Sequence, residues 1–567
     1  MISKKIYQLK GFFKKLGIDG YIVPKNDEFF SEYSKVNKLK LISNFSGSAG
    51  YAIILKNKNY LFVDGRYTIQ AQKESGKYFK ITKYEKIFNC NLFNNLTLGI
   101  NPRLFTSEQV KRFFGKKTII RQINSDLIEN IFRKSPNKQK PFFSLKKSIS
   151  GESHKKKIGK VVDWLKKERS NYLFISAPEN VAWLLNIRGY DNPHSPIPNC
   201  RLLIDIKKKF FLVSEKNSAR KLIKEKKIKN YQLINPQKFD ELLNKLEKGK
   251  IIIDSKSCSL FFENLFKKKF KVIKKEDPIY YLKAIKNSKE IKGMINSHIS
   301  DGVALTKFLY WIKEINKKKI TEYDAQKKLE NFRKMNKNYL TPSFNTIAGS
   351  GGNAAIVHYH ASKKNSKKIN KKDIFLCDSG GQYKYGTTDV TRTICFNKQK
   401  NNIKNIFTKV LKGHIAVATT NLKTHYNGKL IDIKARKYLK NSNLDYEHGT
   451  GHGVGFYSNV HEGPQAISKF NLIKISKGMI LSNEPGYYKK GKFGIRIENL
   501  LYVKNLNNKL FFKNLTLAPI EKDLINFKLL NKQEKIYLFK YHLEVYSKLS
   551  KFLNKNEKKW LTSFLTF

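Results

Sequence analysis

The chain has 567 residues, 40% of them hydrophobic, which is enough for about three domains with apolar cores. Its 112 Lys and Arg against 45 Asp and Glu give a formal net charge of +67, but the lysines are spread along the whole chain, so we expect no specific nucleic-acid partner. The sequence lacks a long apolar run, a secretory leader and cysteine spacing typical of disulfide or zinc sites, so a cytoplasmic protein without a membrane partner is expected.

The first predicted domain, residues 1–145, is an α/β unit. Ile6, Leu9, Phe13 and Leu16 fall on one face of an amino-terminal helix, and Gly17 is expected to stop it. Short apolar strands and helices then alternate. Residues 146–280 begin with another helix and repeat this rhythm at similar size, which indicates duplication.

Long helices begin after Asp277-Pro278, which marks the start of the third predicted domain, residues 281–517. Apolar residues recur at three- and four-residue steps over residues 291–312, with Ser288 as the expected N-cap. Thr321 is expected to cap the next helix, and a third helix is predicted at 405–422.

Two acids in this domain belong to predicted strands. Residues 374–377 are apolar and deliver Asp378 at a strand end, and in the following strand Asp389, Thr391 and Thr393 share one face because side chains alternate. Glycines between the strands favour reversal of the chain, so both carboxylates are expected to lie close together. Two close carboxylates repel each other unless a positive charge lies between them.

Two further acids follow the same pattern. A short apolar strand ends in Glu484, and one alternating strand, residues 494–503, is predicted to carry Arg496 and Glu498 on one face. Burying such carboxylates without a partner is costly, and a cation removes that cost. His452, in a glycine-rich loop that lets the backbone approach closely, would add a nitrogen ligand.

The predicted metal ligands are therefore Asp378, Asp389, His452, Glu484 and Glu498. Each one taken alone is usually a structural residue, but their joint pattern indicates a metal site. Four carboxylates and one imidazole without a thiolate suit hard or borderline ions, which favours Mn²⁺. Because carboxylates bridge, these ligands are enough for two divalent ions about 3.5 to 4 Å apart, as in two-metal hydrolysis.

The tail, residues 518–567, is predicted to be a helical extension. An apolar stripe repeats at helical spacing in it, and such a stripe is typical of core or dimer contacts rather than of catalysis. The stripe consists of Ile536, Phe539, Leu543, Tyr546, Leu549 and Leu553.

Six sequence blocks resemble, in order and spacing, the signatures of the pita-bread metallopeptidases of family M24, and within them the long, three-domain Xaa-Pro aminopeptidases. The resemblance implies two tandem creatinase-like α/β domains, a pita-bread catalytic domain and the carboxyl-terminal extension. The blocks are residues 343–360, 378–393, 448–455, 460–465, 483–488 and 494–499.

By this resemblance the five ligands bind two metal ions, and His358, His448 and His461 are substrate-side histidines. His358 and His461 would stabilise the charge of the tetrahedral intermediate, and His448 would line the pocket for the proline ring. Glu484 would also move a proton from the nucleophile to the leaving nitrogen. Arg496, close to Glu498 on its predicted strand, would orient carboxylate oxygens and belong to the substrate-binding set.

The implied activity is hydrolysis of the amino-terminal Xaa-Pro bond of peptides by a metal-bridged hydroxide, in a homodimer. A prolidase, which cuts only dipeptides, is the closest alternative. The other is a pita-bread domain that binds peptides without catalysis; relatives of that kind lack one or more of the ligands, whereas this chain keeps all five.

Overall fold

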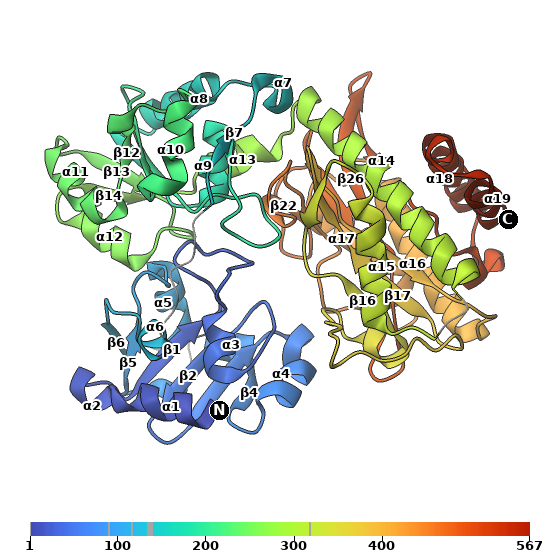
Figure 1. Cartoon of the computed structure of the whole chain (residues 1–567), viewed down its shortest axis with the longest axis horizontal. Helices are drawn as coiled ribbons and strands as arrows, with labels where there is room; N and C mark the ends of the chain where they lie inside the picture. The colour runs from blue at the N-terminus through green and yellow to red at the C-terminus, as the bar shows by residue number, and fades with distance from the viewer. Residues whose placement is uncertain (1, 89–90, 115–116, 133–139, 317–318, 567) are drawn as a thin grey trace. The chain divides into compact units, whose positions relative to one another are not determined.

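The computed structural model describes residues 2–88, 91–114, 117–132, 140–316 and 319–566. The chain forms two compact units. The first contains Met1–Lys147 and Glu152–Ile279, and the second contains Ser148–Gly151 and Tyr280–Phe567 (Figure 1). Among the described residues, no helix is both long and apolar enough to cross a membrane.

The first unit begins with a six-stranded sheet of order β4-β3-β2-β1-β5-β6. The central pairs β1/β2 and β2/β3 are antiparallel, whereas β3/β4, β1/β5 and β5/β6 are parallel. The strands are β1 Gly20–Pro24, β2 Tyr51–Leu55, β3 Asn59–Val63, β4 Lys80–Lys83, β5 Thr97–Ile100 and β6 Ile119–Gln122. The helices are α1 Ile2–Gly11, α2 Phe13–Leu16, α3 Lys38–Ser43, α4 Thr68–Ser75, α5 Ser107–Phe113 and α6 Leu127–Phe132.

The second half of this unit repeats the topology strand for strand. Its sheet has the order β12-β11-β10-β8-β13-β14, with antiparallel and parallel pairs at the same places, as the predicted duplication requires. The strands are β8 Tyr172–Ile175, β10 Arg201–Asp205, β11 Phe210–Val213, β12 Leu233–Ile234, β13 Lys250–Ile253 and β14 Lys271–Lys274. The helices are α8 His154–Lys167, α9 Pro178–Leu185, α10 Lys216–Lys224, α11 Phe239–Lys245 and α12 Leu260–Lys267. A short pair, β7 Phe143–Ser144 with β9 Ile187–Arg188, and helix α7 Lys147–Ser150 complete the segment.

The second unit is built from antiparallel strands covered by helices. The largest of these sheets has five strands in the order β22-β21-β23-β26-β27. Two sheets have three strands, β16-β17-β20 and β15-β18-β19, and β24-β25 form a pair. The strands are β15 Tyr339–Pro342, β16 Ile347–Ser350, β17 Phe375–Ser379, β18 Gly381–Tyr383, β19 Gly386–Thr387, β20 Val390–Ile394, β21 Gly451–Gly453, β22 Glu462–Ile467, β23 Ile480–Asn483, β24 Gly486–Lys489, β25 Phe493–Arg496, β26 Asn499–Leu506 and β27 Lys509–Asn514.

Helices of the second unit begin with α13 and the 23-residue α14. The cap of α14 is Asn287, whose side chain accepts the Glu290 amide proton, so the predicted cap at Ser288 was one residue late. Thr321 caps α15 as predicted. These helices are α13 Ile279–Ala284, α14 Ser288–Tyr310, α15 Glu322–Lys334, α16 Asn401–Ala418 and α17 Gly428–Lys440.

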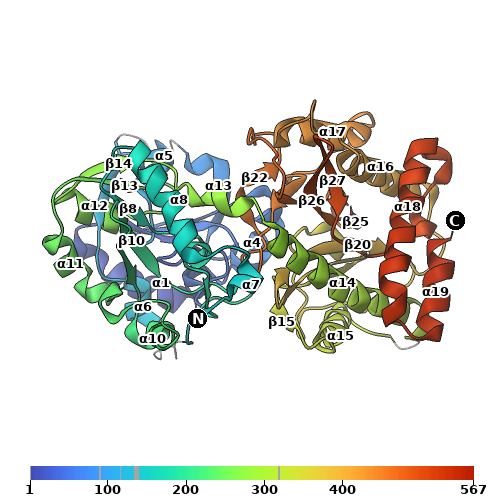
Figure 2. The ribbon, with the colours of Figure 1, turned by 90° about the horizontal axis from the view of Figure 1, so that it is seen from above.

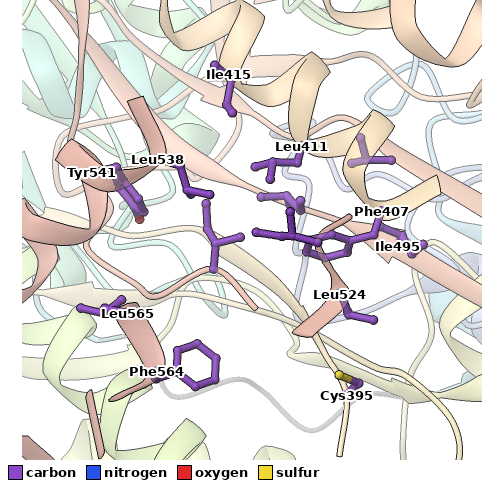
Figure 3. Close-up of a cluster of buried hydrophobic side chains, with 14 of the residues drawn as sticks. Cys395, Phe407, Leu411, Ile415, Ile495, Leu524, Leu538, Tyr541, Phe564 and Leu565 are labelled. Carbon is purple, nitrogen blue, oxygen red and sulfur yellow. The ribbon is translucent and has the colours of Figure 1, made fainter. Parts of the chain in front are cut away.

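The carboxyl-terminal extension forms α18 Lys532–Leu549 and α19 Lys555–Leu565, which lie side by side (Figure 2). Leu538 and Phe564 of these helices join a core with Phe407 and Leu411 of α16 and Ile495 of β25 (Figure 3). The extension therefore belongs to the core of the second unit.

The predicted apolar stripe of α18 is only partly buried within the chain. Phe539 is 59% exposed and Leu543 56% exposed. The face that is buried instead carries Tyr541 and His542, two side chains with polar atoms. Helical periodicity of apolar residues did not predict this face, because the face is buried with polar groups on it. These polar groups find hydrogen-bond partners inside the protein.

Candidate metal centre

Five different elements bring the predicted ligands to the second unit's sheets. Asp378 lies on β17, Asp389 directly precedes β20, His452 lies on β21, Glu484 directly follows β23, and Glu498 lies between β25 and β26. Strands β17 and β20 pair directly, with Asp378 opposite the residue two positions after Asp389. The predicted proximity of these two strands is confirmed.

Ligand-type atoms from different elements meet in the interior. One ligand atom each of Asp389, His452 and Glu498 can be chosen so that all lie within 4.8 Å of one another. The Nε2 atom of His452 is 3.5 Å from Asp389 Oδ2 and 3.5 Å from Glu484 Oε1. Its Nδ1 atom is 2.9 Å from the backbone oxygen of Gly453, which directs Nε2 toward the carboxylates.

Burial and mutual repulsion perturb these groups strongly. Burial, reinforced by the charges of Asp389 and Glu484, raises the pKa of Asp378 to about 7, although Arg496 opposes the shift. Burial and neighbouring carboxylates also raise the pKa of Glu484 and the pKa of Glu498. Burial lowers the pKa of His452, but its hydrogen bond to Asp389 and the charge of Glu484 outweigh burial and raise this pKa to about 9. The cluster carries more negative charge than its protein partners neutralise.

The donor set fits divalent metal ions. Asp378 uses Oδ2 to accept a hydrogen bond from Arg496, but its buried Oδ1 has no hydrogen-bond partner among the described residues. A buried carboxylate oxygen without a partner is costly, and a metal ion provides one. Carboxylate oxygens with a single imidazole nitrogen are ligands that hard and borderline divalent ions accept.

Arg496 and Thr391 hold two of the carboxylates in place. The Arg496 guanidinium donates to Asp378 Oδ2 at 2.5 Å and to Thr391 Oγ1 at 3.0 Å. Thr391 Oγ1 in turn donates to Glu498 Oε2 at 2.7 Å. The sequence placed Asp389 and Thr391 on one strand face, and the threonine hydroxyl is what joins Arg496 to Glu498.

The single strand predicted for residues 494–503 is two strands. Strand β25 pairs with β24 as far as Arg496, and β26 pairs with β23 from Asn499 onward. Ile497 and Glu498 form the connection where the chain changes partner. Alternation within one sheet therefore does not explain how Glu498 reaches the cluster, because the break in the ladder lies at this residue.

Two of the histidines predicted to lie on the substrate side adjoin this cluster. His448 Nε2 is 2.8 Å from the Tyr488 hydroxyl oxygen, which accepts a hydrogen bond from Arg496 at 2.7 Å. The ring centroid of His461 is 4.3 Å from that of His452. Tyr488 was not predicted as a site residue, because a tyrosine on a short strand is ordinary.

His358 lies on a different segment, between the helical turn Gly351–Ala355 and β17, and it is half-buried there. The turn packs against β25, since a Cβ atom at Gly494 would lie 1.9 Å from the backbone oxygen of Ala354. The loop of His358 is thus attached to the strand that carries Arg496.

Arg392, which was not predicted as a site residue, holds the backbone next to the cluster. Its buried guanidinium donates to the backbone oxygens of Thr391 at 2.8 Å and Glu498 at 2.7 Å. It also donates to the backbone oxygen of Pro519 at 2.9 Å and to the Tyr541 hydroxyl at 2.9 Å. One side chain thereby ties the strands of the ligands to the carboxyl-terminal extension.

Comparison with known families finds four matches along the chain. Residues 292–505 match metallopeptidase family M24, and residues 508–563 match the C-terminal region of that peptidase family. Residues 5–117 and 133–290 each match a creatinase/prolidase N-terminal domain.

Several relatives match the chain over almost its full length. A probable Xaa-Pro aminopeptidase P of Coprinopsis cinerea is 34% identical over 99% of this chain and 97% of its own. Xaa-Pro aminopeptidase 1 of Dictyostelium discoideum is 36% identical, over 99% and 96%. The crystal structure of an X-prolyl aminopeptidase from Caenorhabditis elegans, described as cytosolic with a di-nuclear active site, has a TM-score of 0.91 at 27% identity and covers both chains fully. A prolidase from Pyrococcus furiosus, at 25% identity and a TM-score of 0.51, covers 63% of this chain and 98% of its own.

Proposed function

The chain belongs to metallopeptidase family M24 and is a metal-dependent aminopeptidase of its Xaa-Pro group; from this premise we propose that it removes the amino-terminal residue from peptides whose second residue is proline. The observation that carries the proposal is the cluster of Asp389, His452 and Glu498 ligand atoms within 4.8 Å, with Glu484 beside His452. The Xaa-Pro bond needs a dedicated enzyme, because its nitrogen bears no hydrogen and the ring fixes φ.

We propose Asp378, Asp389, His452, Glu484 and Glu498 as the ligands of two divalent ions. When bound, these ions supply an activated nucleophile and polarise the scissile carbonyl. The Asp378 oxygen that lacks a partner and the raised carboxyl pKa values support this assignment, because both indicate a missing positive charge.

The remaining roles follow from what each side chain can donate or hold. Glu484 moves the proton from the nucleophile to the leaving nitrogen. His358 and His461 donate hydrogen bonds to the carbonyl oxygen as its charge develops, and His461 lies beside His452 in support of this role. His448 lines the pocket for the proline ring. Arg496 belongs to the substrate-binding set and also holds Asp378 in place.

Three further parts of the proposal concern the setting of the enzyme. Mn²⁺ is proposed as the metal because hard carboxylates dominate the donor set. A homodimer is proposed from the likeness to the family, and the exposed Phe539 and Leu543 of α18 offer an apolar contact for it. A cytoplasmic location is proposed, in keeping with the description of the Caenorhabditis elegans relative as cytosolic.

The prolidase alternative is disfavoured by coverage. The prolidase from Pyrococcus furiosus covers 63% of this chain, whereas the X-prolyl aminopeptidase covers all of it. The alternative of a peptide-binding module without catalysis is disfavoured by the complete set of five ligand-type side chains.

The test compares two substrates on the Mn²⁺-loaded protein, Arg-Pro-Pro and the dipeptide Gly-Pro. We expect release of arginine from the tripeptide, loss of this activity after chelation, and its return with added Mn²⁺. Asp389→Asn should abolish the activity. Asp163→Asn, which changes an exposed acid of α8, is the matched control and should retain it.

Cleavage of Gly-Pro alone would replace the proposal with a prolidase. Absence of metal-dependent cleavage of either peptide would favour the binding module. Full activity of Asp389→Asn would reject the proposed ligand set while leaving the substrate assignment in place.

A further inference from the structure

Residues 350–367 carry His358 and are called the His358 loop. Directly after this loop the chain pairs with the residues that precede α15. Thr321 forms an antiparallel bridge with Lys368, and the amide of Ile369 donates to the backbone oxygen of Ile320 at 2.9 Å. The next residue after Thr321 is Glu322, the first residue of α15. Its side chain is 0% exposed, although a glutamate in the first turn of a helix is ordinarily on the surface.

The Glu322 carboxylate accepts hydrogen bonds from the beginning, the middle and the end of this loop. Its Oε1 atom accepts from the Ser350 amide at 2.8 Å and from Asn353 Nδ2 at 3.0 Å. Its Oε2 atom accepts from the Tyr359 hydroxyl at 2.7 Å and from the Lys367 amide at 2.9 Å. One buried side chain therefore holds together both ends of the loop and the residue next to His358.

Only an ionised carboxylate can serve all of these donors. It offers acceptor sites on both oxygens, whereas an amide would turn one NH₂ group toward a backbone N–H that also needs an acceptor. The position at the start of α15 adds the partial positive charge of the helix end, which stabilises the negative charge there. A glutamine at this position would keep the shape of the side chain and lose about half of its hydrogen bonds.

The loop has a second point of attachment, on the side of the proposed active site. The helical turn Gly351–Ala355 packs on β25, where the backbone oxygen of Ala354 fills the space above Gly494. His358 lies between this contact and Tyr359. Its backbone is thus held on one side by the strand that carries Arg496 and on the other by Glu322.

Hydrogen bonds to the Glu322 side chain, within the described part of the chain, come from this loop and not from the five proposed ligand residues. A change at Glu322 should therefore alter the loop and leave the metal ligands in place. This separation distinguishes it from Arg496 and Thr391, which contact the carboxylates directly.

We propose that Glu322 is a positioning residue for His358: it fixes the loop so that the imidazole meets the peptide substrate in the orientation that catalysis requires. The inference rests on the proposed function, and specifically on the substrate-side role of His358. Supporting residues of this kind change activity by about 10- to 100-fold when they are removed.

The test is a double-mutant cycle in the full-length, Mn²⁺-loaded protein with Glu322→Gln, His358→Ala and the double variant, using Arg-Pro-Pro as substrate. We expect Glu322→Gln to lower kcat/KM by about 10- to 100-fold, mainly through kcat, and to have no further effect once His358 is alanine. Bound metal should equal that of the wild type, and hydrogen exchange should accelerate at the amides of Ser350 and Lys367. Glu330→Gln lies on the same helix and changes a partly exposed carboxylate that pairs with Lys334 at 3.0 Å; it is the matched control and should match the wild type.

Tyr359→Phe is the milder variant to use if Glu322→Gln does not fold. It removes one of the hydrogen bonds to the carboxylate and should give a smaller loss of kcat that also disappears in the His358→Ala background.

Equal losses from Glu322→Gln with and without His358 would overturn the inference, and so would unchanged kinetics or a loss of bound metal. If His358→Ala alone keeps full activity, the role proposed for His358 fails and the inference fails with it, while metal-dependent cleavage of Arg-Pro-Pro still upholds the proposed function. If the wild type does not cleave the peptide at all, the proposed function fails first.

Discussion

Substitution of Tyr541 by phenylalanine removes one buried hydroxyl from the junction between α18 and the metal centre. This hydroxyl accepts from Arg392 Nη2 at 2.9 Å and from the Ala518 amide at 3.2 Å, and it donates to the Ala518 backbone oxygen at 2.8 Å. Phenylalanine fills the same space, so no cavity beyond the hydroxyl arises. Nη2 of Arg392 keeps Asn499 Oδ1 and the Ala518 oxygen as acceptors.

The expected cost follows from these bonds. A hydrogen bond to a charged group contributes about 1.5–3 kcal/mol, and a neutral one contributes about 0.5–1.5 kcal/mol. Because bonds that share one network are not additive, we expect Tyr541→Phe to lower the free energy of unfolding of the second unit by about 2–4 kcal/mol. Tyr537→Phe on the same helix removes a hydroxyl bonded to Asn514 Nδ2 at 3.0 Å and should cost about 0.5–1.5 kcal/mol.

Urea unfolding of the metal-loaded proteins, followed by circular dichroism, measures the difference. The chain has two compact units, so the titration is analysed for more than one transition, and the shift should be confined to the unit that contains α18. A loss for Tyr541→Phe that is no larger than the loss for Tyr537→Phe would refute the view that this hydroxyl bonds a buried guanidinium.

Three further predictions concern single side chains. Thr391→Val removes the hydroxyl bonded to Glu498 and should weaken metal binding about 10- to 100-fold in a chelator competition, whereas unchanged affinity would contradict the contact. Burial lowers the pKa of His542 to about 3 from its ordinary 6.5, so the folded state stays neutral while the unfolded state takes up a proton. The stability that this histidine contributes is complete above pH 6.5 and falls as the pH drops toward 3. By pH 4.5 the loss is about 2–3 kcal/mol. His542→Gln should remove this loss, so urea titrations should show a smaller difference in the free energy of unfolding between pH 7 and pH 4.5. An unchanged difference would contradict the prediction. Gly428→Ala would place a Cβ atom 1.7 Å from a backbone oxygen of β22 and should lower the melting temperature. Gly159→Ala within α8 meets nothing within 4 Å and should raise the free energy of unfolding by about 0.5–1 kcal/mol, and with it the melting temperature. Equal melting temperatures of the two variants would refute the contrast.

The repeated α/β architecture was predictable because its signal is local. Short apolar strands bounded by turn residues, and helices with one apolar face, are visible in any window of the sequence, and the two halves of the first unit repeat them in one order. The face of α18 was not predictable in this way. Tyr541 and His542 are buried there because Arg392 and the amide of Ile520 supply their partners from distant parts of the chain.

The residues of the candidate site differ in the same way: some were predictable from local sequence and others were not. Asp378 and Glu484 stood out because an acid at the end of an apolar strand is unusual and calls for a partner. Tyr488 and Glu322 did not stand out, because a tyrosine on a short strand and a glutamate in the first turn of a helix are ordinary residues at those positions. Their importance comes from contacts with His448, Arg496 and the loop of His358, which only the folded chain brings to them.

The hydrogen bonds of the Arg392 guanidinium have a consequence for biosynthesis. The guanidinium holds the backbone of Glu498, yet its last partner, Tyr541, is encoded 149 residues downstream of it. Translation proceeds from the amino terminus, so the five proposed metal ligands leave the ribosome before Tyr541 does. The hydrogen bond between Arg392 and the carboxyl-terminal extension can therefore form only after α18 has been synthesised.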